Sequence, residues 1–359
     1  MGVRTAMRAR TRKPTSSRVR RPIRVQVLAL ADCTPLPAIG VPDLLRKAIE
    51  LTAMLPIPAP PPIEVSLVAV GSKARVVAAG GLEIRCDTTT SEAEPADVVV
   101  VSALDPDVLV RMEKNRAAIP FVQRAFAAGA DVMSLCTGAF LLAEAGLLDG
   151  REAATHWAFQ PLFEARYPKV RVVPQAVIVD HGRIVTAGGA TSFLNLTLLL
   201  IERLMGEEVA RAASKMFLVD PNKAPQGAYA IFASQKSHSD TGVLKAQQRI
   251  ERELASTPSV EALAREAGTS VRTFARRFRQ ATGNSPHQYV QRVRIDAAKR
   301  ALESGELAIA TVAERVGYGD PVAFRKLFVQ HTGLTPTDYR ARYGARVAPA
   351  WVSKRAKRA

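Results

Sequence analysis

The stretch VRTFARRFRQATGNSPHQYVQR, residues 271–292, decides the fold of the C-terminal part of the chain because it occurs twice. Shifted by fifty positions, it falls on PVAFRKLFVQHTGLTPTDYRAR, residues 321–342. The identical pairs of positions include Phe274 and Phe324, Phe278 and Phe328, Thr282 and Thr332, Gly283 and Gly333, Pro286 and Pro336, Tyr289 and Tyr339, Arg292 and Arg342. So many identities at one offset indicate two copies of a single structural unit.

Each copy predicts two helices joined by a tight turn. In the first copy, Thr257 and Pro258 predict the start of a helix that ends at Gly268, and Ser270 predicts the cap of the next helix. In the second copy, Asp320 is the corresponding cap. Helix, short turn containing glycine and helix is the pattern of the helix-turn-helix unit.

The outward face of the second helix in each unit is mostly basic. It offers Arg272, Arg276 and Arg277 in the first unit, and Arg325 and Lys326 with Pro321 and Val322 in the second. A capping box at Ser285-Pro286-His287-Gln288 begins a connecting helix of roughly 28 Å, close to the ~34 Å of one DNA turn. The alternative is a solvated face on a plain helical bundle, but a basic face that recurs on both copies favours DNA binding.

The net charge of +17 is unevenly distributed along the chain. Residues 243–343 hold seventeen basic and ten acidic residues, whereas residues 23–242 hold twenty basic and twenty-three acidic residues. The arm 1–22 and the tail 344–359 hold basic residues and no acidic ones, and we expect both to be disordered. This division indicates two domains with different partners, of which the basic one binds nucleic acid. Residues 219–242, rich in Pro, Gly, Ser, Asn and Asp, have the composition of a linker.

Residues 243–343 resemble the AraC/XylS family of bacterial transcription regulators, most clearly in AIATVAERVGYGDPVAFRKLFVQHTGLTPTDYRARY, residues 308–343. The resemblance implies an all-α domain with two helix-turn-helix units that binds double-stranded promoter DNA and acts on RNA polymerase, as an activator. It places the groove-facing positions on Val271, Arg272, Ala275, Arg276, Pro321, Val322, Arg325 and Lys326. Ala275, Pro321 and Val322 depart from the commoner polar residues, so base readout should be sparse and partly apolar.

Residues 23–218 predict an α/β sandwich with a mostly parallel, flavodoxin-like sheet. Apolar runs predict buried strands and longer periodic segments predict helices. The expected strands are Val25–Leu30, Glu64–Val70, Asp97–Ser102 and Asp131–Leu135, and the expected helices are at about 41–54, 106–128, 138–146 and 191–205. Ala176–Val179 and Arg183–Ala187 predict a late hairpin.

Cys136 marks the most informative point of this domain. It stands where the strand 131–135 runs directly into a helix, so its side chain should project from the carboxyl end of the sheet, as in a nucleophile elbow. A catalytic cysteine also needs a base, for which His156 and Asp32 are candidates. The alternative is a small buried apolar residue.

The segment SLCTGAFLLAEAGLLDGREAATHW, residues 134–157, resembles the PfpI-like branch of the class I glutamine amidotransferase superfamily that is fused to AraC-type domains. The resemblance implies an elbow at Cys136, but Thr137 replaces the usual His, Asp32 is at best the supporting acid, and Ser102 lies where a Gly-rich oxyanion loop is common. We therefore expect no enzyme activity and a site near Cys136 for a small nitrogenous effector, an amino acid or a quaternary amine. The rival reading is a cysteine-dependent hydrolase or lyase with a DNA-binding domain.

His156 and Trp157 have two readings of equal weight. An imidazole and an indole can line a pocket for a cationic or amide ligand, the indole by a cation–π contact. Alternatively they are a partly buried pair at the start of a helix. We also expect a homodimer, no metal, no cofactor and no membrane span, and a bacterial cytoplasmic, nucleoid-associated location, since three widely spaced cysteines fit a reducing compartment.

Overall fold

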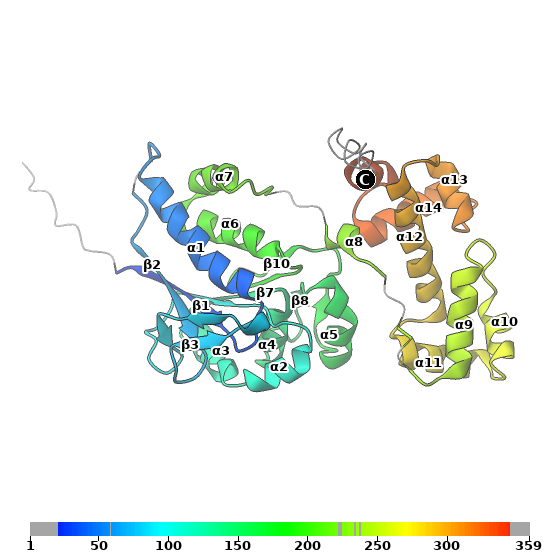
Figure 1. Cartoon of the computed structure of the whole chain (residues 1–359), viewed down its shortest axis with the longest axis horizontal. Helices are drawn as coiled ribbons and strands as arrows, with labels where there is room; N and C mark the ends of the chain where they lie inside the picture. The colour runs from blue at the N-terminus through cyan, green and yellow to red at the C-terminus, as the bar shows by residue number, and fades with distance from the viewer. Residues whose placement is uncertain (1–20, 58, 222–224, 233–234, 237, 345–359) are drawn as a thin grey trace, which may run out of the picture.

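The computed structural model describes residues 21–57, 59–221, 225–232, 235–236 and 238–344. All of the basic tail except Gly344, and all of the basic arm except its last two residues, lie outside this part of the chain. Figure 1 shows a body built around a sheet and a separate helical body, with a short helix of the connecting segment, α8 (Gln226–Tyr229), between them.

The N-terminal body is built around a seven-stranded sheet with the order β10-β11-β7-β6-β1-β2-β5. Each neighbouring pair in it is parallel except β10 and β11, which form the predicted late hairpin. Its strands are β1 (Ile23–Ala29), β2 (Ile63–Ala69), β5 (Thr88–Thr89), β6 (Val98–Val101), β7 (Asp131–Leu135), β10 (Ile178–Asp180) and β11 (Ile184–Ala187). Four consecutive buried valines form β6, as expected for a central strand covered on both faces. The flavodoxin-like, mostly parallel sheet is therefore confirmed.

Helices cover both faces of this sheet. The helices α1 (Pro35–Thr52), α6 (Ser192–Met205) and α7 (Glu207–Met216) pack together on one face, and α2 (Val108–Lys114), α3 (Ala118–Ala127) and α4 (Ala139–Glu144) lie on the other (Figure 1). The remaining elements are β3 (Arg75–Val77), η1 (Ala79–Gly81), β4 (Glu83–Arg85), η2 (Cys136–Gly138), β8 (Glu152–Ala153), η3 (Trp157–Phe159), α5 (Gln160–Arg166) and β9 (Arg171–Val172).

The single helix predicted over 106–128 is wrong. Asn115 interrupts it, because its side-chain amide donates to the carbonyl of Ala31 at 2.9 Å and its Oδ1 accepts from the amide of Ala31 at 2.8 Å. The chain therefore leaves helical geometry at Asn115, where φ is −103°, and resumes it in α3. This tie fixes the loop that follows β1.

Seven helices make up the C-terminal body. They are α9 (Thr241–Arg252), α10 (Val260–Glu266), α11 (Val271–Thr282), α12 (Pro286–Ser304), α13 (Ile309–Arg315), α14 (Pro321–Thr332) and α15 (Pro336–Tyr343). The predicted start at Thr257 is wrong: α10 begins at Val260 with Ser259 as its cap, while the Thr257 hydroxyl donates back to the carbonyls of Glu253 and Leu254. The caps at Ser270 and Asp320 and the capping box at Ser285 are confirmed.

The fifty-residue repeat is visible in the packing. The ring of Phe278 lies 5.3 Å from that of Tyr289, and the ring of Phe328 lies 5.4 Å from that of Tyr339, both edge to face. The two units nevertheless have separate hydrophobic cores, with the connecting helix α12 contributing to both. In the described residues, no helix is long and apolar enough to cross a lipid bilayer.

Candidate functional site

The carboxyl ends of three neighbouring strands meet at Cys136. Cys136 follows β7 directly with a φ of 54°, a left-handed conformation that non-glycine residues adopt at a cost. A Cβ on Gly138 would lie 2.7 Å from the carbonyl oxygen of Ser102, which shows how closely the turn is pressed against the loop after β6. The hydroxyl of Thr137 donates to the carbonyl of Leu104 in the same loop at 2.5 Å. We call Cys136 and the residues that contact it the elbow.

The opposite side of the elbow comes from later in the chain. The hydroxyl of Thr155 donates to the carbonyl of Cys136 at 3.1 Å. The backbone of Gly189, just after β11, lies close enough to the Cys136 thiol to lower its pKa. The side chain of Gln226, from α8, donates to the carbonyl of Thr155 at 3.1 Å. Gln226 was not predictable from the sequence, because only its tertiary contacts, and no motif, distinguish it from other residues of the connecting segment.

The environment of the half-buried Cys136 disfavours its thiolate form. Burial raises its pKa to about 11, although hydrogen bonds from Thr137 and from the backbone of Gly189 act in the opposite direction. A reactive cysteine needs a nearby cation or base to stabilise the thiolate. The elbow thus has the backbone geometry of a nucleophile without the electrostatics of one.

Asp32 lies near the elbow loops, but its carboxylate is engaged elsewhere. It accepts from Lys114 at 2.7 Å and lies 3.1 Å from Arg111, both on α2. The hydrogen bond from Lys114 holds the pKa of Asp32 below its usual range, with the charge of Arg111 contributing. Asp32 therefore ties α2 to the loop after β1.

Ser102 is fully buried beneath the turn, and its amide donates to the carbonyl of Leu28 at 3.3 Å. His156 caps η3, where its Nδ1 accepts from the amide of Ala158 at 3.2 Å. Burial lowers the pKa of His156, which favours the neutral ring. Its ring lies 5.2 Å from that of Trp157. His156 thus stands at the start of η3, as the second of the two readings expects, and a ligand-binding role for His156 and Trp157 stays a prediction.

Trp157 borders a cleft of about 430 Å³ between the two bodies. Gln160 and Gln175 line the cleft from the N-terminal body, and Arg292 and His331 line it from the helical body. The charge of Arg292 reaches across it: burial raises the pKa of Glu164 on α5, and Arg292 partly opposes that shift. The cleft thus lies at the boundary between the two bodies, and Cys136 is not among the residues that line it.

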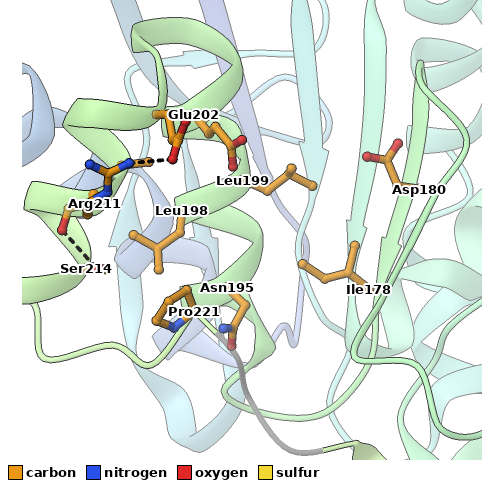
Figure 2. A pocket seen from close by; sticks show the side chains of 11 residues that line it. Ile178, Asp180, Asn195, Leu198, Leu199, Glu202, Arg211, Ser214 and Pro221 are labelled. Atoms are coloured by element: carbon orange, nitrogen blue, oxygen red, sulfur yellow. Dashed lines mark hydrogen bonds and ion pairs between the residues drawn. The ribbon is translucent and has the colours of Figure 1, made fainter.

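A second hollow, of about 410 Å³, lies between β10, α6 and α7 (Figure 2). Among its charged side chains, Arg211 pairs with Glu207 at 2.5 Å and Asp180 pairs with Arg203 at 2.6 Å, while Glu202 is exposed. Leu198, Leu199 and Ile178 supply apolar walls. None of the expected site residues lines it.

The predicted DNA-reading residues lie on equivalent exposed faces of α11 and α14. Val271, Arg272, Arg276, Pro321, Val322, Arg325 and Lys326 are exposed, and Ala275 and Arg277 are half-buried. In the part of the chain that the structure describes, the side chains of Arg272, Arg276, Arg325 and Lys326 make no hydrogen bond or ion pair. Arg277 differs, since its guanidinium donates to both carboxylate oxygens of Asp240, at 2.6 and 2.8 Å. Asp240 is the cap of α9, so this pair joins α9 to α11.

The described residues contain no group of three or more His, Cys, Asp or Glu side chains that could hold a metal ion.

Two family models match the chain, one in each body. Residues 48–203 match the DJ-1/PfpI family, and residues 263–342 match a helix-turn-helix domain. The chain is 28% identical over 269 residues to the HTH-type transcriptional regulator GbdR of Pseudomonas aeruginosa. The aligned region covers 74% of this chain and 72% of that protein. It is 28% identical over 273 residues to the HTH-type transcriptional regulator GlxA of Rhizobium meliloti, covering 75% of this chain and 83% of that protein.

An enzyme is also among the relatives. The isonitrile hydratase of Pseudomonas putida is 31% identical over 137 residues, which is 38% of this chain and 58% of the enzyme. The two regulators match over far more residues, a length that exceeds either matched domain and so spans both. The chain belongs to the AraC-type helix-turn-helix regulators that carry an N-terminal DJ-1/PfpI domain.

Proposed function

We propose that the chain contacts double-stranded promoter DNA with α11 and α14 and alters that contact when a small effector binds at the elbow. The observation that carries the DNA-binding part is the pair of equivalent exposed faces. Each face presents two cations with no partner in the described residues, Arg272 and Arg276 on one and Arg325 and Lys326 on the other. Unpaired cations on the exposed faces of two repeated helices, with Arg276 and Lys326 at equivalent positions, suit contact with the phosphates of two successive turns of DNA.

Titration of DNA with the full chain tests this part. A duplex selected for binding to the full chain should be bound with a steep dependence on salt, each neutralised phosphate contributing roughly −0.9 to the log–log slope. Arg276→Ala and Lys326→Ala should each weaken binding by about tenfold and flatten the slope by about one unit. Lys47→Ala, which removes an exposed cation from α1, is the control. Unchanged affinity and slope in both face variants would contradict the proposal.

The effector part of the proposal rests on the elbow, where Cys136 has the backbone conformation of a nucleophile but burial disfavours its thiolate. We propose a small nitrogenous ligand, a homodimer of the N-terminal domain and activation through RNA polymerase as the accompanying features. The division of the chain at 218 and 243 is part of the same proposal, with 219–242 as the segment that connects sensor and DNA-binding domains.

A cysteine-dependent hydrolase or lyase is the second candidate, favoured by the isonitrile hydratase relative and by the left-handed Cys136. The pKa of the Cys136 thiol, which burial raises to about 11, supports the sensor and provides the test that separates the two functions. If Cys136 only shapes a sensor site, its alkylation by iodoacetamide should be slow at pH 7 and rise about tenfold per pH unit until near pH 11, because only the thiolate reacts. Peptide mass spectrometry reports the rate at Cys136, with Cys136→Ser as the blank. A fast rate that is already level at pH 7 would favour the enzyme.

A further inference from the structure

The helix α8 connects the two bodies: Gln226, its first residue, packs into one, Ala228 packs into the other, and Gly227 contacts both. Gln226 is only 3% exposed and contacts the N-terminal body, whereas Ala228 is 2% exposed and belongs to the core of the second helix-turn-helix unit. The figure shows α8 between the bodies (Figure 1). A segment expected to be a simple linker therefore packs on both sides.

Gln226 fits the N-terminal body closely. Its Nε2 donates to the carbonyls of Thr155 at 3.1 Å and of Ala176 at 2.6 Å, and its backbone amide donates to the carbonyl of Gln175 at 3.0 Å. A Cβ on Gly188 would lie 2.0 Å from this Nε2, so the contact requires glycine there. The Oε1 of Gln226 is buried and, among the described residues, has no hydrogen-bond partner.

The same groups that hold Gln226 also hold Cys136. Thr155 accepts from Gln226 with its carbonyl and donates to Cys136 with its hydroxyl. The backbone of Gly189 lies close enough to the Cys136 thiol to lower its pKa, and a Cβ on Gly189 would lie 3.6 Å from the Oε1 of Gln226. The amide group of Gln226 thus occupies space that belongs to the elbow.

The rest of α8 is held by the second helix-turn-helix unit. Lys299 on α12 donates to the carbonyl of Gly227 at 3.3 Å. The rings of Tyr229 and Tyr343 lie 5.7 Å apart, edge to face. Pro225 presses against Gly333, the residue that ends α14, where a Cβ would lie 2.5 Å from the proline ring.

A second tie runs beside α8. The side-chain amide of Gln175 donates to the carbonyls of Gln330 and His331, at 2.8 and 2.6 Å, and its Oε1 accepts from the amide of Gly227 at 3.1 Å. The carboxyl end of α14 is thus bound to the strip of backbone that also receives Gln226. Hydrogen bonds through Gln175 and Gln226 therefore connect the elbow with the end of α14.

We propose that Gln226 is an internal occupant of the elbow and that the effector binds by taking the place of its amide group. This inference rests on the proposed function for the identity of the site. The carbonyls of Thr155 and Ala176 accept from the Nε2 of Gln226, so the replacing group must carry N–H donors: a primary amide, a guanidinium or a primary ammonium. A quaternary amine has no N–H and does not satisfy these carbonyls. The buried Oε1 has no hydrogen-bond partner among the described residues, which lowers the free energy needed to displace the Gln226 amide.

Access to Cys136 measures whether Gln226 occupies the elbow. In the full chain, Gln226→Ala should increase the rate of iodoacetamide labelling at Cys136 by about tenfold, because the hydrogen bonds that hold the amide are lost. Gln226→Glu, which keeps the shape but turns an N–H donor into an oxygen facing two carbonyls, should do the same. Gln123→Ala is the matched control, since it removes a glutamine amide that donates to the carbonyl of Ala145 on the same body.

Hydrogen exchange supplies the second readout. Both Gln226 variants should speed amide exchange in α14 and leave α11 as in the unchanged chain. Wild-type labelling rates and unchanged α14 exchange in both variants would overturn the proposal. The proposed function fails by a different result, the loss of salt-dependent DNA binding, to which cysteine labelling is blind.

The ligand class is tested with L-arginine and glycine betaine, which share a carboxylate but differ in N–H donors. In Gln226→Ala, where the internal competitor is gone, L-arginine should raise the melting temperature more than glycine betaine does, and more than L-arginine does in the unchanged chain. Equal shifts with the two compounds, including no shift with either, would overturn the requirement for N–H donors.

Discussion

The second helix of each helix-turn-helix unit ends at a glycine with almost the same backbone, Gly283 with a φ of 71° and Gly333 with a φ of 73°. Their surroundings differ. A Cβ added to Gly283 would meet nothing within 4 Å, whereas one added to Gly333 would lie 2.5 Å from the ring of Pro225. Gln175 of the sensor domain also binds the last carbonyls of α14.

The residues that build each unit are therefore different from the residues that connect a unit to the N-terminal body. Repeated residues build the same frame twice: the Tyr289 hydroxyl donates to Glu251 at 2.8 Å, and the Tyr339 hydroxyl donates to Glu303 at 2.6 Å. The contacts with α8 and with Gln175 lie at the second unit. We infer that the first unit supplies a fixed contact with DNA, and that the second is the one whose setting the sensor domain controls.

The largest expected effects come from the two cores. Phe278→Ala and Phe328→Ala each remove a fully buried ring and should lower the free energy of unfolding by about 3–5 kcal/mol. Urea denaturation of the full chain, followed by hydrogen exchange of each unit, measures the loss. Phe328→Ala should in addition speed the labelling of Cys136, because α8 contributes Ala228 to that core. Equal acceleration by Phe278→Ala would break the proposed asymmetry.

A smaller effect is expected at the two glycines that end α11 and α14. Gly283→Ala and Gly333→Ala both force alanine into a left-handed conformation, which costs about 1–2 kcal/mol. Gly333→Ala must also displace Pro225, so it should lower the melting temperature further and loosen α8, as seen by faster exchange of the α8 amides. Equal melting temperatures and equal α8 exchange in the two variants would show that the contact between Pro225 and α14 does not stabilise α8.

The smallest effect is expected at Arg277, which lies fifty positions before the apolar Leu327. Arg277→Ala breaks the ion pair with Asp240 and should lower the melting temperature slightly while leaving the salt slope of DNA binding unchanged. Arg276→Ala should show the reverse: a flatter slope at an unchanged melting temperature. A flatter salt slope of DNA binding with Arg277→Ala would show that Arg277 contacts DNA.

Local patterns predicted the parts of the fold that depend on neighbouring residues. The strand at Asp131–Leu135, the caps at Ser270 and Asp320 and the repeat depend on signals a few residues apart, and each is confirmed. The interruption at Asn115 was not predictable, because it depends on hydrogen bonds to Ala31, far away in the sequence.

The site was predictable in position and less so in composition. The left-handed conformation of Cys136 follows from a strand that runs directly into a helix. The engagement of Asp32 by Lys114 and Arg111 and the presence of Gln226 are products of tertiary structure. A glutamine in a segment of linker composition carries no local signal that its amide is buried between two carbonyls.

Hydrogen exchange of α11 and α14 after modification of Cys136 tests whether the elbow controls the second helix-turn-helix unit. Iodoacetamide alkylates the Cys136 thiol with loss of iodide and so introduces a primary amide into the elbow. With the full chain labelled at high pH and returned to neutral pH, and with Cys136→Ser treated identically, we expect faster exchange in α8 and α14 and no change in α11. Equal changes in α11 and α14, or no change in either, would show that the elbow does not act selectively on the second unit.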